Sequence, residues 1–249
     1  MANFGFSRLA VVAPYEDHWR EAKSAIGASE LLQNAKRVER LAEAVADCTL
    51  VVGTGTLEHR NPEQPVIPLP ELAPIVAAEF ARGGCVALVF GPEKRGLTRE
   101  DFALCHLLVE IPTDPFQPSM NLGQAVAVCL YELTRAPHPF PSWPGAGTGA
   151  PPSATADGRT ANVESHAVAA APASPRDPAC ARDLELLAGV VAETMQAANY
   201  SPAAMHKANR HDLDLLLRRL TLTRPDAQRI LGLFRRILWR LKRGSGFKD

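Results

Sequence analysis

Four short apolar runs, separated by stretches with helical spacing, most constrain the fold of the first 135 residues. Each run is rich in valine and leucine and is continuously apolar, which is typical of strands that are covered on both faces. Because strands that alternate with helices form mostly parallel sheets, this pattern predicts an α/β fold. The predicted strands are 9–13, 49–53, 86–90 and 107–111, and the predicted helices are 35–46, 70–82, 98–105 and 122–134.

The composition is that of an ordinary globular protein, with 46% hydrophobic and 22% charged residues. No apolar run reaches the ~18–20 residues of a membrane span, and the N-terminus lacks the regions of a secretory signal. The five cysteines form no CxxC pair and the seven histidines form no HExxH motif, which predicts reduced thiols and no metal site. We therefore expect a cytoplasmic protein that binds neither a membrane nor a metal ion.

Residues 136–178 differ from the rest of the chain because they hold 9 of its 21 prolines and show no apolar periodicity. Such a segment buries too little surface to offset the entropy of an ordered chain. The sequence thus predicts an α/β domain over 1–135, a flexible linker over 136–178 and a helical domain over 179–249.

The helical domain concentrates positive charge. Residues 206–249 contain 12 Lys and Arg against 4 Asp and Glu, although the whole chain has a net charge of zero. Two interpretations stay open: a surface that binds a polyanion, or the solvated face of a helix. Trp239 lies among these arginines. We expect it to pack between helices, with stacking on a nucleobase as the alternative.

Three glycine-containing segments follow predicted strands and carry the other candidate site residues. They are VVGTGT at 51–56, FGPEKRGLT at 90–98 and IPTDPFQPSMNLGQAVAV at 111–128. In open α/β sheets, ligands bind beyond the carboxyl ends of the strands, where these segments are expected. Each also has an ordinary structural interpretation: a strand exit, a tight polar turn, or a helix cap formed by Ser119 or Asn121.

Taken together, FGPEKRGLT and the following IPTDPFQPSMNLGQAVAV resemble the second and third signature motifs of the SpoU/TrmH family. These proteins are RNA ribose 2′-O-methyltransferases of the SPOUT superfamily. NFGFSRLAVVAP at 3–14 is similar to the end of the family's first helix and its second strand. The helices of 179–243 resemble the C-terminal extension of the branch that methylates tRNA in the anticodon loop.

The resemblance implies an α/β fold of the SPOUT type, a trefoil-knotted and mostly parallel sheet, with a small C-terminal helical extension. It implies that three strand-end loops hold S-adenosyl-L-methionine. The implied cofactor-binding residues are Thr54, Gly55, Thr56, Gly91, Ile111, Pro118, Ser119 and Met120, and the implied catalytic residues are Glu93, Ser119 and Asn121.

The resemblance also implies tRNA as the partner and a homodimer as the assembly. Basic side chains of the last predicted helix would bind RNA phosphates. The implied RNA-binding residues are Arg229, Arg235, Arg236 and Arg240.

One part of the family pattern aligns before Met1. The first motif of the family has the form NxGxxxR, and its arginine is credited with activating the ribose hydroxyl. We therefore expect the true start of the protein to lie upstream. The alternatives are a catalytically inactive RNA-binding paralogue and a non-RNA α/β enzyme with a helical dimerisation tail.

Overall fold

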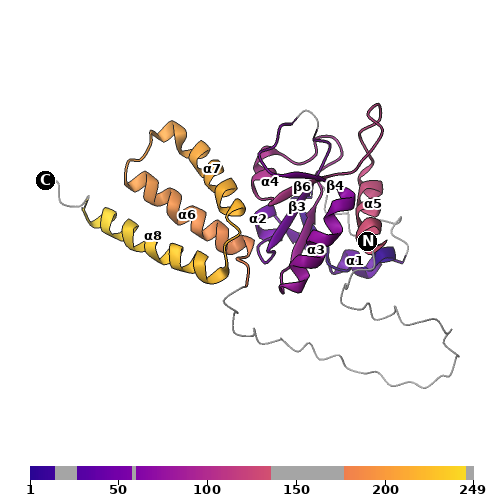
Figure 1. Cartoon of the computed structure of the whole chain (residues 1–249), viewed down its shortest axis with the longest axis horizontal. Coiled ribbons are helices and arrows are strands. Elements are labelled where there is room, and N and C mark those ends of the chain that lie inside the picture. The colour runs from indigo at the N-terminus through magenta and orange to yellow at the C-terminus, as the bar shows by residue number, and fades with distance from the viewer. Residues whose placement is uncertain (15–26, 58–59, 136–176, 245–249) are drawn as a thin grey trace, which may run out of the picture.

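The computed structural model describes residues 1–14, 27–57, 60–135 and 177–244, which form an α/β unit followed by a unit of three helices (Figure 1). The α/β unit begins with the 3₁₀ turn η1 (Ala2–Phe4). The edge of the Phe4 ring meets Tyr131 with ring centroids 6.2 Å apart, which places the N-terminal turn beside α5 (Leu122–Arg135). Most of the predicted linker lies outside the described residues.

The α/β unit contains two parallel sheets, as the sequence predicts. The larger has the strand order β4 (Val66–Pro68), β6 (Leu107–Glu110), β3 (Leu50–Thr54) and β5 (Val86–Val89), and the smaller pairs β1 (Ala10–Val12) with β2 (Lys36–Val38). Gly53 is in register with Val89 on one side and with Leu108 on the other. Because all these pairings are parallel, β3, β5 and β6 end at the same edge of the sheet. The trefoil knot stays a prediction.

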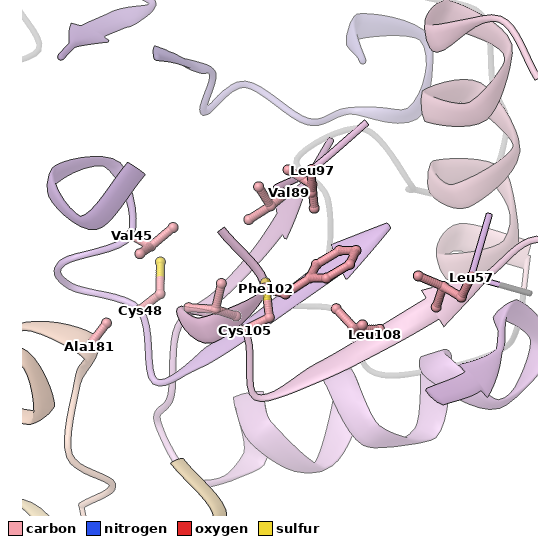
Figure 2. Close-up of a cluster of buried hydrophobic side chains, with 10 residues drawn as sticks. Val45, Cys48, Leu57, Val89, Leu97, Phe102, Cys105, Leu108 and Ala181 are labelled. Atoms are coloured by element: carbon pink, nitrogen blue, oxygen red, sulfur yellow. The ribbon is translucent and has the colours of Figure 1, made fainter. Parts of the chain in front are cut away.

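Side chains alternate between the two faces of the larger sheet, and helices cover both faces. Val51 and Leu108 belong to a buried cluster shared with α4 (Arg99–Ala103) and bordered by α2 (Leu41–Ala44), which Figure 2 shows. Val52 and Val109 face a second cluster with α3 (Leu72–Ala81) and α5. This three-layer packing explains why the central strands read as continuous apolar runs.

One local prediction is wrong, and several short elements were not predicted. The predicted helix over 35–46 is wrong, because Lys36–Val38 pairs with β1 as a strand and only Leu41–Ala44 is helical. Strand pairing here overrides a helical apolar spacing. Strand β4 was not predicted, since it has three residues and ends in a proline at the sheet's edge. Two further short elements, α1 (Ser29–Gln33) and η3 (Leu69–Glu71), were not predicted either.

The second unit contains α6 (Ala181–Ala197), the 3₁₀ turn η4 (Ala203–Met205), α7 (His206–Arg219) and α8 (Arg224–Gly244). Helix α6 packs against both α7 and α8, as Figure 1 shows. The buried core of this helical unit includes Leu184, Leu187, Ala188, Val191, Leu217 and Ala227. No helix in the described part of the chain is long and apolar enough to cross a membrane.

The helical unit docks on the α/β unit through the start of α6 and through α7. The Ala181 backbone N–H donates to the Cys48 carbonyl at 2.8 Å, and the Ala181 side chain joins the buried cluster of Figure 2. Lys207 of α7 lies 3.2 Å from the Glu100 carboxylate of α4. Arg218 of α7 is buried beside Cys105 and His106. The two units therefore share a packed interface.

His106 stands at this interface, between α4 and β6. Its Nδ1 accepts a hydrogen bond from the Val51 backbone N–H at 3.0 Å, so this nitrogen carries no proton. Burial, and next the positive charge of Arg218, lower the pKa of His106 to about 4. The folded protein thus holds a neutral imidazole in a structural role.

We expect the free energy of unfolding to fall as the pH drops from about 6.5 to about 4. In this window the unfolded state binds a proton at His106 that the folded state excludes, so acid favours unfolding. Between pH 7 and pH 5 the loss is about 2 kcal/mol, measurable by urea denaturation. His106→Asn removes the titrating group but keeps an acceptor. An unchanged pH dependence in that variant would contradict the assignment.

Candidate functional site

The candidate site is formed by three loops that leave the carboxyl ends of adjacent parallel strands. The β3–β4 loop covers 55–65, the β5–α4 loop covers 90–98 and the β6–α5 loop covers 111–121. Since β3 lies between β5 and β6, the three loops emerge side by side. Each pair of loops is joined by side-chain hydrogen bonds.

Arg60 joins the β3–β4 loop to the β5–α4 loop. Its Nη1 donates to the Leu97 carbonyl at 2.6 Å and its Nη2 donates to the Arg95 carbonyl at 3.1 Å. Its guanidinium carbon also lies 5.2 Å from the centroid of the Phe102 ring, a cation–π distance. Arg60 therefore fixes the path of the β5–α4 loop. The sequence analysis missed it because its partners are backbone carbonyls, which leave no pattern of residue types.

Glu93 joins the β5–α4 loop to the β6–α5 loop. Its Oε1 accepts a hydrogen bond from Asn121 Nδ2 at 2.7 Å and another from the Leu122 backbone N–H at 3.2 Å. Asn121 Oδ1 in turn accepts from the Gly123 backbone N–H at 2.9 Å, which caps α5. The capping interpretation of Asn121 and its assignment to the site are thus compatible, because one amide serves both contacts.

Thr56 joins the β3–β4 loop to the β6–α5 loop. Its hydroxyl donates to the Pro118 carbonyl at 3.2 Å, and the Thr113 hydroxyl lies 3.4 Å from the same oxygen. Beneath this contact, the Leu57 backbone N–H donates to Glu110 Oε1 at 3.0 Å. The three loops therefore form a closed set of contacts in which each touches the other two.

Glycine is required at one position of this set. A Cβ on Gly91 would lie 2.2 Å from the Gly96 carbonyl carbon and 2.3 Å from the Leu97 nitrogen. Gly96 itself has a φ of +64°, a conformation that side chains disfavour. The β5–α4 loop thus folds back on itself at two glycines, which explains the GPEKRG pattern.

The structure brings some predicted site residues together and gives others separate roles. Glu93 meets Asn121, and Thr56 meets Pro118. The buried Thr54 hydroxyl donates to the Val89 carbonyl at 2.9 Å and so joins β3 to β5. Ser119 is exposed and its hydroxyl has no hydrogen-bond partner among the described residues. Gly55, Gly91, Ile111 and Met120 are partly buried around these contacts.

The rim of the site carries positive charge. Lys94 and Arg95 are exposed on the β5–α4 loop, and their side chains form no ion pair with any residue that the structure describes. Across that part of the chain, no group of three or more His, Cys, Asp or Glu residues is placed to hold a metal ion.

The predicted RNA-binding arginines lie on the exposed side of α8. At roughly 100° per residue, Arg229, Arg236 and Arg240 share one face of the helix, whereas Arg235 is turned away from it. Arg243, which was not predicted, belongs to the same face. The expectation that Trp239 packs between helices is wrong, because its side chain is 50% exposed while residues such as Leu238 form the buried side.

Comparison with known proteins places the chain in a family. Residues 1–131 match the profile of the SpoU rRNA Methylase family, and this range contains all three loops. The match covers more than half of the chain, so the chain belongs to this family and the resemblance seen in its motifs is confirmed.

Individual relatives are TrmJ proteins. The tRNA (cytidine/uridine/adenosine-2′-O-)-methyltransferase TrmJ of Pseudomonas aeruginosa is 39% identical over 137 residues, which are 55% of this chain and 53% of that protein. The tRNA (cytidine/uridine-2′-O-)-methyltransferase TrmJ of Pectobacterium atrosepticum is 37% identical over 138 residues, which are 53% of this chain and 55% of that protein. The chain thus spans about half the length of the curated relatives it matches.

A solved structure extends the shared fold beyond the α/β unit. The crystal structure of TrmJ from Z. mobilis ZM4 matches with a TM-score of 0.72 at 24% identity, and the match covers 95% of this chain and 89% of that one. Both units therefore have counterparts in a solved fold.

We expect Gly91→Ala to destabilise the protein by about 1–3 kcal/mol, the usual cost of overpacking, because backbone atoms must move to admit the Cβ. Gly55→Ala is the matched control: its Cβ would lie 3.6 Å from Leu57 Cδ2, an ordinary contact. Thermal unfolding of both variants distinguishes them. Equal stability of the two would show that the loop is not closed as described.

We expect Arg60→Met to free the β5–α4 loop, because methionine keeps the contact with Phe102 but donates no hydrogen bond. The loss should be about 1–2 kcal/mol for the two bonds, with faster amide exchange at 91–97. Arg40→Met is the control, since the exposed ion pair of Arg40 with Glu43 lies outside the three loops. Unchanged exchange in the Arg60 variant would contradict its role in holding the loop.

Proposed function

We propose that the chain is an S-adenosylmethionine-dependent tRNA ribose 2′-O-methyltransferase that acts in the anticodon loop. The observation that carries this proposal is the closed set of contacts among the three strand-end loops. These contacts lie within the residues that match the family profile. The names of the TrmJ relatives support tRNA as the substrate and the ribose 2′ oxygen as the methyl acceptor.

The residues at the loop edge fit S-adenosylmethionine in their chemistry. Ile111 and Met120 are partly buried apolar side chains that suit the face of an adenine, and Gly55 and Gly91 leave backbone groups approachable. Thr54 contributes through its backbone, since its hydroxyl is already bonded. When bound, S-adenosylmethionine supplies a methyl group on a positively charged sulfur, and transfer requires the accepting oxygen to be in line with it.

The three proposed catalytic residues have two roles: one contacts the ribose, and the other two position the loop that carries it. Ser119 has the hydroxyl with no partner among the described residues, so it is the group available to bond the 2′-OH and orient it. Glu93 and Asn121 hold the start of α5, and with it the adjoining Ser119, in place. The 2′-OH must lose its proton as the oxygen–methyl bond forms. As the sulfur–methyl bond breaks, this proton passes to solvent water, which reaches the exposed Ser119.

Two surfaces support the proposed partners. The arginine-bearing face of α8 is suited to RNA phosphates, and bases of an anticodon loop are unpaired and accessible. On the α/β unit, Leu122 is exposed at the start of α5, next to Asn121, and we propose that a second copy of the chain covers it as a homodimer partner. We propose that the protein acts on tRNA in the cytoplasm.

The direct test is transfer of a labelled methyl group from S-adenosylmethionine to unmodified tRNA, with nucleoside analysis of the product. We expect label in 2′-O-methylnucleosides of the anticodon loop. Ser119→Ala should lower the rate at least about tenfold, while Ser29→Ala, another exposed serine, should leave it unchanged.

Two outcomes would contradict the proposal. Label on a base would assign a different reaction. Binding of tRNA without any transfer would favour the inactive RNA-binding paralogue.

A further inference from the structure

Trp239 lies at one edge of the exposed basic face of α8, between Arg243 and Arg235 around the helix axis. Its indole is half exposed, and the guanidinium carbon of Arg243 lies 4.1 Å from its ring centroid. The guanidinium carbon of Arg240 lies 5.9 Å from the same centroid. Helical periodicity places Arg236 three residues before Trp239 and Arg243 four residues after it, on one side of the helix. An aromatic ring is therefore flanked by cations along the helix.

This ring is separate from the apolar stripe of α8. Leu233 and Ile237 lie roughly 120° and 160° away from Trp239 around the helix axis, where they line a shallow groove with Leu241 and with two arginines of the basic face, Arg236 and Arg240. The buried side of the helix, which includes Phe234 and Leu238, packs towards α6. Trp239 thus belongs neither to the core nor to one continuous apolar patch that would suit a protein partner.

The charge of the face identifies the chemistry of its partner. Within the described residues, the ion pairs of α8 are Arg224 with Asp183, Arg229 with Asp226 and Lys242 with Glu193. The other four basic side chains of the helix have no carboxylate partner there. These are Arg235, Arg236, Arg240 and Arg243. Four unneutralised guanidiniums on one helix are complementary to a polyanion.

We propose that Trp239 stacks on an unpaired nucleobase of bound RNA, while Arg236 and Arg243 contact the phosphates on either side. This inference rests on the proposed function, which makes RNA the partner of α8. Every base has a π-face, so an exposed indole binds it without reading its identity, and neighbouring guanidiniums add electrostatic attraction. A duplex offers no such face along its length, so the site selects single-stranded RNA.

The test measures binding of the full chain to a single-stranded oligoribonucleotide and to an RNA duplex of the same length, over a series of salt concentrations. We expect Trp239→Ala to weaken single-strand binding about 5- to 150-fold, with duplex binding nearly unchanged. The slope of log affinity against log salt should stay at its wild-type value. Arg236→Gln should instead reduce that slope by about 0.7.

Two further variants separate stacking from a general loss of structure. Trp239→Phe keeps an aromatic face and should retain most of the affinity. Tyr200→Ala removes another exposed aromatic ring of the helical unit, 70% exposed but outside α8, so it should have no effect. Circular dichroism establishes that each variant is folded.

Three results would overturn the inference: unchanged single-strand binding by Trp239→Ala, equal losses on single strand and duplex, or a salt slope that falls as it does for Arg236→Gln. If the wild-type chain binds no RNA at all, the proposed function fails and the inference fails with it.

Discussion

The parallel, in-register pairing of β6, β3 and β5 is the constraint on which the site depends. It brings three strand ends to one edge of the sheet, although the loops that follow them are far apart in the sequence. Position alone would leave three independent loops. Arg60, Glu93 and Thr56 convert them into one body, because each of these residues bonds a neighbouring loop. A cofactor that touches all three loops then meets a preorganised surface and loses less affinity to ordering them.

The helical unit packs against the amino ends of the strands, at the edge of the sheet opposite to the three loops. The Ala181 side chain belongs to the apolar cluster that packs against β3. Its backbone N–H donates a hydrogen bond to the carbonyl of Cys48, just before that strand. Arg218 lies buried against Cys105 and His106, which precede β6. Helix α8 packs on α6, and α6 in turn contacts the α/β unit. Packed contacts therefore link the helix of the proposed phosphate contacts to the unit that carries the proposed methyl-transfer site.

Much of this was readable from the sequence, and the failures have physical causes. Continuous apolar runs predicted the central strands because both sheet faces are covered. The helix predicted over 98–105 begins, in the structure, at a capping box formed by Thr98 and Asp101. Strands β2 and β4 were not predicted because, unlike the equally short β1, their three residues include two charged side chains and a proline, respectively, and form no apolar run. The motifs indicated Glu93 and Asn121, but their direct hydrogen bond required the fold. Arg60 donates its hydrogen bonds to backbone carbonyls, and the exposure of Trp239 depends on which side of α8 packs against α6. Neither leaves a signal in residue types.

The central claim is that the three loops act as one cofactor site, and hydrogen–deuterium exchange with and without S-adenosylmethionine tests it most directly. The account predicts that amides of the β3–β4, β5–α4 and β6–α5 loops gain protection together, at the same cofactor concentration. It also predicts that α8 amides stay unchanged, because they are remote from the site. Protection of a single loop, or protection elsewhere in the chain with all three loops unaffected, would contradict it.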